Sequence, residues 1–523
     1  MKKYAILLFA AVFVGFATLK AEVVTPSQAI RIAEEFLGES LAPQRVRAMR
    51  RTASAAPQED APYYVISRGD DKGYILVSGD DCQPAVLGYT DSGDFDENNL
   101  PPALRDMLNC VTDVVTLGRE AKLPSYAPRR ANAYRETITP LMKSHWNQGA
   151  PWNILCPICP DNGDHAVVGC VATATSQVIY YFRKDLPHQL LATTPTYRGG
   201  EEQCDVTVSY PKGTPIEYDL MFDSYNNNEP QELKLPVATL CFTIGAAARL
   251  GYWHSTGGYI SEANKAMKSH FGLGGTHLSR NEMEIENWES FIYGSLAAQK
   301  PLIYSGFTTD GKSGHAINID GYNARNGLWH FNFGWGGGGD GWYTLDLKDG
   351  VNGFSIWQEI VYNITPTHPN VSGVIHTDST LYRRVLGSVS VDITNNGTVP
   401  VKGFQLYLQT TEKAPSSSST AVATNNETTI APGETVSVPF EFRPSLTRSY
   451  FIYATDANRQ VITHASVNVV DPTPSFNLHG IDASVSTDTI MVDGMAFYKL
   501  NGNTVSVFAD ISNSAEATRG SPP

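Results

Sequence analysis

Cysteine is scarce in this chain, with seven residues among 523. A small fold held together mainly by disulfides is therefore excluded, and a hydrophobic core must stabilise the chain. Because the number is odd, at least one thiol has no partner within an exported monomer. The cysteines are Cys82, Cys110, Cys156, Cys159, Cys170, Cys204 and Cys241.

Basic residues and long apolar runs are also in short supply. The 39 Lys and Arg residues face 53 Asp and Glu residues, for a net charge of −14, and no basic stripe interrupts this balance. Nucleic acids are therefore excluded as partners. The apolar run of residues 4–19 follows Lys2 and Lys3 and precedes Ala21, which is typical of a secretory signal peptide over residues 1–21, with an uncleaved anchor as the alternative. No later run is apolar enough to span a membrane.

Signatures of cofactor and metal sites are missing as well. Residues 334–339 contain G-x-G-x-x-G, but they follow aromatic strands instead of opening a helix, and no Gly-Lys-Ser/Thr phosphate loop is present. We interpret this run as a mobile loop beside an aromatic-lined site, or as a plain surface turn. Cys156 and Cys159 lie in a loop with Pro151 and Pro160, which favours a local disulfide or two idle thiols over a redox or zinc site. We expect no cofactor and no metal.

The first part of the chain has the pattern of a small α+β unit. Thr25 and Gln28 form a capping box before a helix that ends at Gly38. Two strands joined by a hairpin, a third strand and an amphipathic helix follow, at residues 63–67, 73–78, 85–89 and 104–115. The Pro- and Arg-rich residues 123–132 are the best linker in the chain, and exposed linkers are cut readily. We predict a propeptide over residues 22–128.

The remainder divides into three further regions. Residues 129–366 have helical patterns at 170–182, 237–248 and 261–271, and then strands at 301–305, 314–321 and 328–335, which predicts an α+β domain with a cleft between its halves. Short alternating strands over residues 370–471 predict an immunoglobulin-like β-sandwich. Residues 472–523 begin a further β module, too short to close a sandwich, so the chain is interpreted as a truncated form of a longer protein.

Cys170 lies at the start of a predicted helix. Gly169 precedes it, and Val171, Ala174, Val178 and Phe182 form one apolar stripe. The helix dipole and unpaired N–H groups at this position lower a cysteine pKa from its usual value of about 8.5, which favours a nucleophilic thiolate. The alternative is a buried structural cysteine.

His315 and Asn332 are the candidate partners of this thiol. If they face each other on antiparallel strands, the centre of the hairpin falls between Asn323 and Ala324, in a turn-rich stretch, and the two side chains share a face. A one-residue slip or a bulge would turn Asn332 away. A nucleophilic cysteine needs a base and a group that orients the base, and Cys, His and Asn form such a set in papain-type enzymes. A purely structural histidine is the alternative.

Two motifs resemble those of the streptopain-like cysteine peptidases, a secreted bacterial branch of the papain-like enzymes. They are Gly169-Cys170-Val171-Ala172-Thr173-Ala174-Thr175, and Gly314-His315-Ala316 with Ile319-Asp320-Gly321. The resemblance covers residues 22–366. It implies an α+β, papain-like fold of a helical half and an antiparallel β half, preceded by an inhibitory propeptide. It also implies catalytic roles for Cys170, His315 and Asn332.

The resemblance extends to the residues around the site. Residues 145–153 are similar to the segment whose glutamine contributes to the oxyanion hole, which gives Gln148 that role; without the family it would be an ordinary polar loop residue. The substrate contacts implied are Gly258, Gly314 and Trp335. Residues 255–258 have Gly258 where the family has serine, and Phe333 replaces a family tryptophan, so Trp335 is left to shield the site.

We therefore expect a secreted or surface-located cysteine endopeptidase made as a zymogen, with proteins or peptides as substrates and its own propeptide as inhibitor. One alternative is a Cys/His amidase that cuts cell-wall peptides. Another is a surface-binding protein that uses the β-sandwich and has an inert cysteine domain. The sequence does not determine the oligomeric state.

Overall fold

In the computed structural model the chain forms two compact units, the first ending at residue 367 and the second beginning at residue 368. The residues that it describes are 21–41, 46–49, 61–126, 134–226, 228–280, 283–308, 310–345, 356–367, 369–397, 400–416, 418–457, 459–472, 476–484, 489–492, 495–498 and 506–513. The predicted signal peptide and much of the predicted linker lie outside these residues.

The first helix, α1 (Pro26–Leu37), confirms the capping-box prediction. Thr25 is its N-cap and accepts from the backbone N–H of Gln28, and the Gln28 side chain reaches back to the N–H of Thr25. The helix ends at Gly38, whose φ of 71° suits glycine. Ala29 and Ala33 are buried and pack against the strands that follow.

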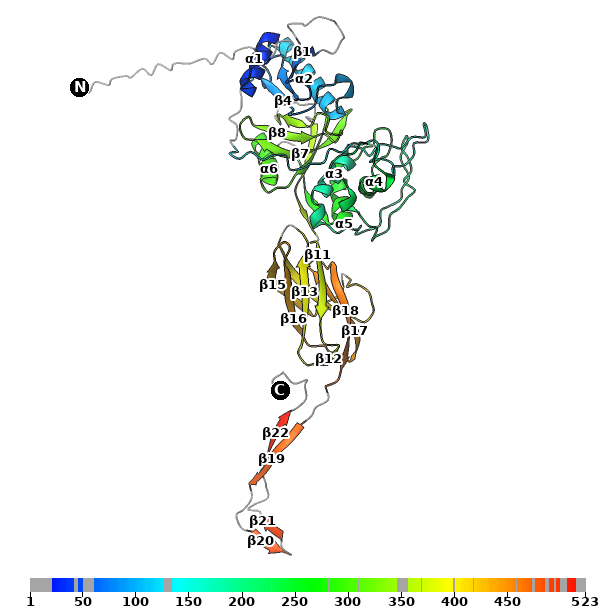
Figure 1. The fold of residues 1–523 in the computed structure, drawn as a ribbon, viewed down its shortest axis with the longest axis vertical. Helices are drawn as coiled ribbons and strands as arrows, with labels where there is room; N and C mark the ends of the chain where they lie inside the picture. The colour runs from blue at the N-terminus through cyan, green and yellow to red at the C-terminus, as the bar shows by residue number, and fades with distance from the viewer. Residues whose placement is uncertain are drawn as a thin grey trace, which may run out of the picture. The chain divides into compact units, whose positions relative to one another are not determined.

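A ten-stranded antiparallel sheet runs through the first unit (Figure 1). It joins the N-terminal strands to those of the predicted catalytic region through β4 and β9, where Gly88 pairs with Tyr343 and Tyr89 with Trp342. A Cβ at Gly88 would lie 2.4 Å from the Tyr343 ring, so the close approach requires glycine. The strands, in sheet order, are β1 (Val46–Met49), β2 (Tyr63–Ser67), β3 (Tyr74–Ser78), β4 (Val86–Tyr89), β9 (Gly341–Tyr343), β8 (Leu328–Asn332), β7 (Gly314–Asn323), β6 (Leu302–Phe307), β10 (Ile356–Pro366) and β5 (Leu273–Ser279).

Helices complete the α+β fold, and the predicted fold class is confirmed. Three of them, α3 (Cys170–Tyr181), α4 (Gln231–Ala247) and α5 (Ile260–Phe271), pack together around one apolar core, and Figure 1 shows them grouped beside the sheet. A second core holds residues of α2 (Pro102–Ala121) and α6 (Ile285–Ala297) together with residues of the sheet. Short 3₁₀ turns cover Glu97–Asn99, Arg183–Asp185 and Tyr218–Leu220. The sequence pattern did not predict α6, β5, β9 or β10, and β1 lies in a stretch, residues 43–60, that the pattern predicted to be a loop.

The predicted register of the β7–β8 hairpin is wrong. Asn332 pairs with Asn318, and His315 pairs with Gly306 on β6. The hairpin loop comprises residues 324–327 and closes at the pair of Asn323 and Leu328, so its centre lies two residues further along the chain than predicted. A bulge at Asp320 shifts the register once more.

The second unit is a β-sandwich around one apolar core that includes Val389, Leu406 and Phe440. One sheet has the order β11 (Val371–His376), β13 (Gly387–Asn395) and β16 (Thr435–Phe442). The other has the order β12 (Thr380–Tyr382), β18 (Val461–Val470), β17 (Arg448–Asp456), β14 (Val401–Gln409) and β15 (Ala423–Ile430). Further along the chain, β19 (Phe476–Ser484) pairs with β22 (Ser506–Asn513), and β20 (Thr489–Val492) with β21 (Met495–Tyr498).

None of the helices in the described part of the chain combines the length and the apolar character that crossing a membrane requires.

Candidate active site

Cys170 is the first residue of α3 and is partly exposed. Gly169, just before it, has a φ of 86°, and a Cβ there would lie 2.6 Å from the carbonyl oxygen of Thr256. Only glycine fits both restraints. The Thr256 hydroxyl donates to the carbonyl of Val167 at 2.6 Å, which ties the two loops together behind the helix start. This local packing presents the thiol where α3 begins.

The electrostatic surroundings of Cys170 favour a thiolate. Burial alone would raise its pKa and is the largest single effect, but the hydrogen bond and charge of His315, with the N–H groups of Ala316 and Val171, lower the pKa below its usual value. His315 responds in the opposite direction. Burial would lower its pKa, yet hydrogen bonds and charges from Asp106 and Cys170 raise it to about 9. Each shift favours the charged form of its group, a thiolate at Cys170 and an imidazolium at His315.

The Nε2 atom of the His315 ring contacts a residue of the N-terminal region, Asp106. His315 Nε2 lies 2.9 Å from Asp106 Oδ2, on α2, and 3.0 Å from the hydroxyl of Ser313. Burial acts to raise the pKa of Asp106, but its hydrogen bonds with His315 and Ser313 lower it overall. The sequence analysis missed Asp106, because only the apolar stripe of α2 stood out and no local pattern links this residue to one 209 positions away.

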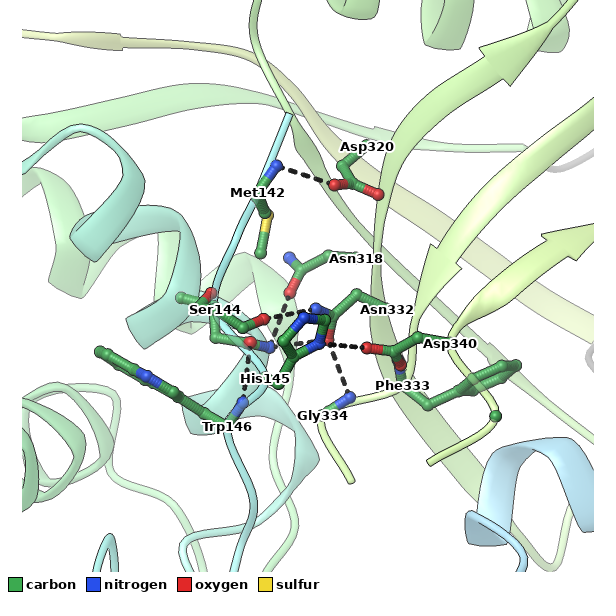
Figure 2. A network of polar contacts seen from close by, with 12 residues as sticks. Met142, Ser144, His145, Trp146, Asn318, Asp320, Asn332, Phe333, Gly334 and Asp340 are labelled. Atoms are coloured by element: carbon green, nitrogen blue, oxygen red, sulfur yellow. Dashed lines mark hydrogen bonds and ion pairs between the residues drawn. The ribbon is translucent and has the colours of Figure 1, made fainter. Parts of the chain in front are cut away.

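Asn332 is buried and directs its side chain toward a different set of groups (Figure 2). Its Nδ2 donates to the carbonyl of Ser144 at 2.8 Å, and its Oδ1 accepts from Gln177 Nε2 and from the N–H of Gly334, both at 3.0 Å. Gln177 Oε1 in turn accepts from the N–H of Trp146 at 3.3 Å. Asn332 therefore ties the end of β8 to α3 and to the segment that leads to Gln148.

A second contact ties the same segment to the glycine-rich run, also visible in Figure 2. His145 Nδ1 lies 3.2 Å from Asp340 Oδ2, while Asp340 Oδ1 accepts from the N–H of Phe333 at 2.8 Å. The N–H of Gly336 donates to the carbonyl of Trp146 at 2.9 Å. Residues 334–339, which the sequence indicated to be a mobile loop or a surface turn, thus form a loop that hydrogen bonds fix to the neighbouring segments.

The aspartate of the motif Ile319-Asp320-Gly321 forms a buried pair with His330. Asp320 Oδ1 lies 2.6 Å from His330 Nδ1, and Asp320 Oδ2 accepts from the N–H of Met142 at 2.9 Å. Burial would lower the pKa of His330, but the charge and hydrogen bond of Asp320 raise it overall. This pair joins β7, β8 and the start of the segment that leads to Gln148, and neither residue is among the described residues that line the cavity beside Cys170.

A cavity of about 1230 Å³ opens beside Cys170. It brings together six of the seven predicted site residues: Gln148, Cys170, Gly258, Gly314, His315 and Trp335. Asn332 is absent from the described residues that line it. Pro102 of α2 also lines the cavity, so the N-terminal region forms part of its wall.

Trp335 follows the end of β8, in the glycine-rich loop. The pairing of β7 with β8 stops at Asn332, so no strand register places Trp335 opposite His315. Both residues line the cavity. The tryptophan therefore shares the cavity with the imidazole, whereas Asn332 is not among the described residues that line it.

Comparison with known proteins decides the family. Streptopain of Streptococcus pyogenes is 30% identical over 331 residues, an alignment that covers 58% of this chain and 80% of streptopain. The chain belongs to the streptopain-like peptidase C10 family. The model of that family matches residues 146–343, and the model of the Spi protease inhibitor matches residues 21–115.

Other C10 relatives are similar over comparable lengths. The thiol protease/hemagglutinin PrtT of Porphyromonas gingivalis is 28% identical over 435 residues, which cover 74% of this chain and 47% of PrtT. A solved fragment of prointerpain A from Prevotella intermedia is 26% identical, with a TM-score of 0.49, and the match covers 60% of this chain and 97% of the fragment. The protein is a cysteine-type peptidase that carries its own inhibitory propeptide, that is, a protease zymogen.

Proposed function

We propose that this zymogen is exported and that its mature form is an endopeptidase, with Cys170 as nucleophile and His315 as general acid and base. The observation that carries the proposal is the Cys170–His315 pair at the cavity, with the two pKa values displaced in opposite directions. A pair of this kind holds a reactive thiolate at neutral pH.

The reaction follows from the positions of these groups. The Cys170 thiolate attacks the peptide carbonyl, and the electron pair of the C=O bond moves onto its oxygen. The backbone N–H of Cys170 and the side chain of Gln148 stabilise this oxyanion. His315 gives its proton to the departing amine, which leaves an acyl-enzyme. His315 then takes a proton from water, the resulting hydroxide attacks the acyl group, and the thiolate is restored as the acid product leaves.

The propeptide inhibits by occupying the site. Residues 22–128 contribute Pro102 to the wall of the cavity and Asp106 to the imidazole, and β4 extends the sheet of the peptidase region. Cutting within residues 123–132 releases them. The mature peptidase domain then spans residues 129–366, followed by the β-sandwich of residues 370–471 and the start of a further β module at 472–523.

The remaining predicted residues have supporting roles. Gly258, Gly314 and Trp335 contact substrate, because they line the cavity beside the thiol. Asn332 is a positioning residue that acts through Ser144 and Gln177, since its hydrogen bonds hold the segment before Gln148. This role replaces the direct orientation of His315 that the sequence suggested.

Labelling with an epoxide-type cysteine-peptidase inhibitor tests the proposal. Processed enzyme should lose casein hydrolysis as one equivalent of inhibitor binds, and peptide mapping should place the adduct on Cys170. The matched control is Cys241→Ala, which removes a buried thiol. An adduct on another cysteine, or activity on purified cell wall but not on casein, would refute the proposal.

A further inference from the structure

Two buried thiols far apart in the sequence lie next to each other in the fold. Cys159 Sγ and Cys204 Sγ lie 3.4 Å apart, although the residues are 45 positions apart in the chain. Cys159 is fully buried and Cys204 nearly so. The sequence had suggested that Cys159 either pairs with Cys156 or stays idle. The fold instead gives it a different neighbour.

A metal ion is the other chemistry that this neighbourhood suggests. The ligand atoms of Cys159, Asp161 and His254 lie within 4.8 Å of one another, and Cys204 does not belong to that group. Asp161 Oδ2 and His254 Nε2 already form a hydrogen bond with each other at 2.8 Å, and both side chains are exposed. Ligand atoms around a tetrahedral zinc lie roughly 3.3–3.8 Å apart, as bond lengths of about 2.0–2.3 Å require. The 3.4 Å between the two thiols fits that spacing as well, but a zinc ion would need further ligands, and the two nearby candidates, Asp161 and His254, are exposed and paired with each other. Among these four described residues only the two thiols are buried, which favours a bond between them.

We propose that Cys159 and Cys204 form a disulfide in the exported precursor. The inference rests on the proposed export, because disulfides form and persist in oxidising compartments. Side-chain rotation closes the sulfur separation from 3.4 Å to about 2.05 Å. The two thiols give up two hydrogen atoms to a disulfide-type oxidant, which leaves as two thiols while the new S–S bond forms.

The bond braces the wall of the substrate cavity. The N–H of Cys204 donates to the carbonyl of Tyr252 at 2.9 Å, and the adjacent Gln203 lines the cavity. On the other side, Cys159 belongs to the loop that includes Asp161, the partner of His254 on the cavity wall. A covalent link between Cys159 and Cys204 would therefore hold two loops that shape the site.

Burial separates this thiol pair from the chemistry of Cys170. Burial, with the hydrogen bond and charge of Cys159, raises the pKa of Cys204 to about 12. The folded protein therefore holds little Cys204 thiolate, so the disulfide forms before packing is complete. Once formed, it is shielded from the reductants that keep Cys170 active.

The test uses the full-length Cys170→Ala chain, refolded with reduced and oxidised glutathione and then alkylated. Digestion without reduction should release one peptide that contains Cys159 linked to Cys204, about 2 Da lighter than the sum of its two thiol forms. The bond should raise the thermal midpoint of the refolded chain above that of the same chain refolded with reductant, by about 5 °C for a loop of this length.

Matched variants separate a disulfide from ordinary packing. The double variant Cys159→Ser, Cys204→Ser should lose the difference between oxidised and reduced midpoints, whereas Cys156→Ser, a buried cysteine of the same loop, should keep it. Alkylation of both Cys159 and Cys204 after oxidative refolding would overturn the proposal. So would a Cys156–Cys159 link, or one equivalent of bound zinc that is lost on Cys159→Ser. None of these results depends on peptidase activity, so they test the disulfide separately from the proposed reaction.

Discussion

The contact between Asp106 and His315 leads to a direct prediction about inhibition. The two side chains are 22% and 15% exposed, so solvent screens the contact only in part. A hydrogen bond between charged groups contributes about 1.5–3 kcal/mol. Since about 1.4 kcal/mol is a factor of ten, Asp106→Ala should weaken binding of the propeptide to the mature enzyme by about 10- to 150-fold.

The assay is a titration of mature peptidase with the separate propeptide of residues 22–128, wild type against Asp106→Ala, with peptide hydrolysis as the readout. Circular dichroism should show that both propeptides have the same helix content. Glu120→Gln is the matched control, because it removes one exposed carboxylate from the same helix. An inhibition constant for Asp106→Ala within threefold of wild type would show that the contact does not contribute to inhibition.

The pH dependence of inhibition follows from the same pair. Hydrogen bonds and charges from Asp106 and Cys170 together raise the pKa of His315 from 6.5 to about 9, so the contact of Asp106 with protonated His315 is fully present below 6.5 and is lost as the pH rises through 9. The pKa of Asp106 is lowered from 3.8, so the contribution of its carboxylate to propeptide binding is present above pH 3.8 and is lost only as the pH falls below that value. The wild-type propeptide should bind more weakly above pH 9, and Asp106→Ala should flatten this alkaline loss.

Three further predictions concern the site itself. Cys170→Ala should abolish peptide hydrolysis, and its precursor should stay uncut unless active enzyme is added. His315→Ala should reduce hydrolysis almost as much. Self-processing of Cys170→Ala at the wild-type rate, seen on a gel, would refute the assignment of Cys170 as the nucleophile. Asn332→Ala should lower the thermal midpoint, because it leaves buried partners unpaired at a cost of about 1–3 kcal/mol each, yet the pH profile of Cys170 alkylation should stay unchanged; a shifted profile would instead indicate direct contact with His315. Gly169→Ala should cost at least about 1–3 kcal/mol through its positive φ alone, and chemical denaturation should show it, whereas Gly149→Ala, with open space at its Cβ, should not.

Much of the local structure could be predicted from the sequence. The capping box at Thr25 and Gln28 places the start of α1, and Gly169 with the apolar stripe after it places Cys170 at the start of α3. The strands that hold His315 and Asn332 follow from runs of β-forming residues. These features depend on hydrogen bonds and side chains within a few positions of one another, so a single sequence carries them.

The partners across the fold were decided by tertiary structure. The register of β7 and β8 depends on the loop of residues 324–327 and the bulge at Asp320, so Asn332 pairs with Asn318 and not with His315. The neighbour of Cys159 is set by how distant loops pack. Asp106 reaches His315 only because the N-terminal strands join the sheet through β4 and β9. The hydrophobic periodicity of a sequence does not indicate contacts of this kind, because they depend on where the packing of the whole unit brings each side chain.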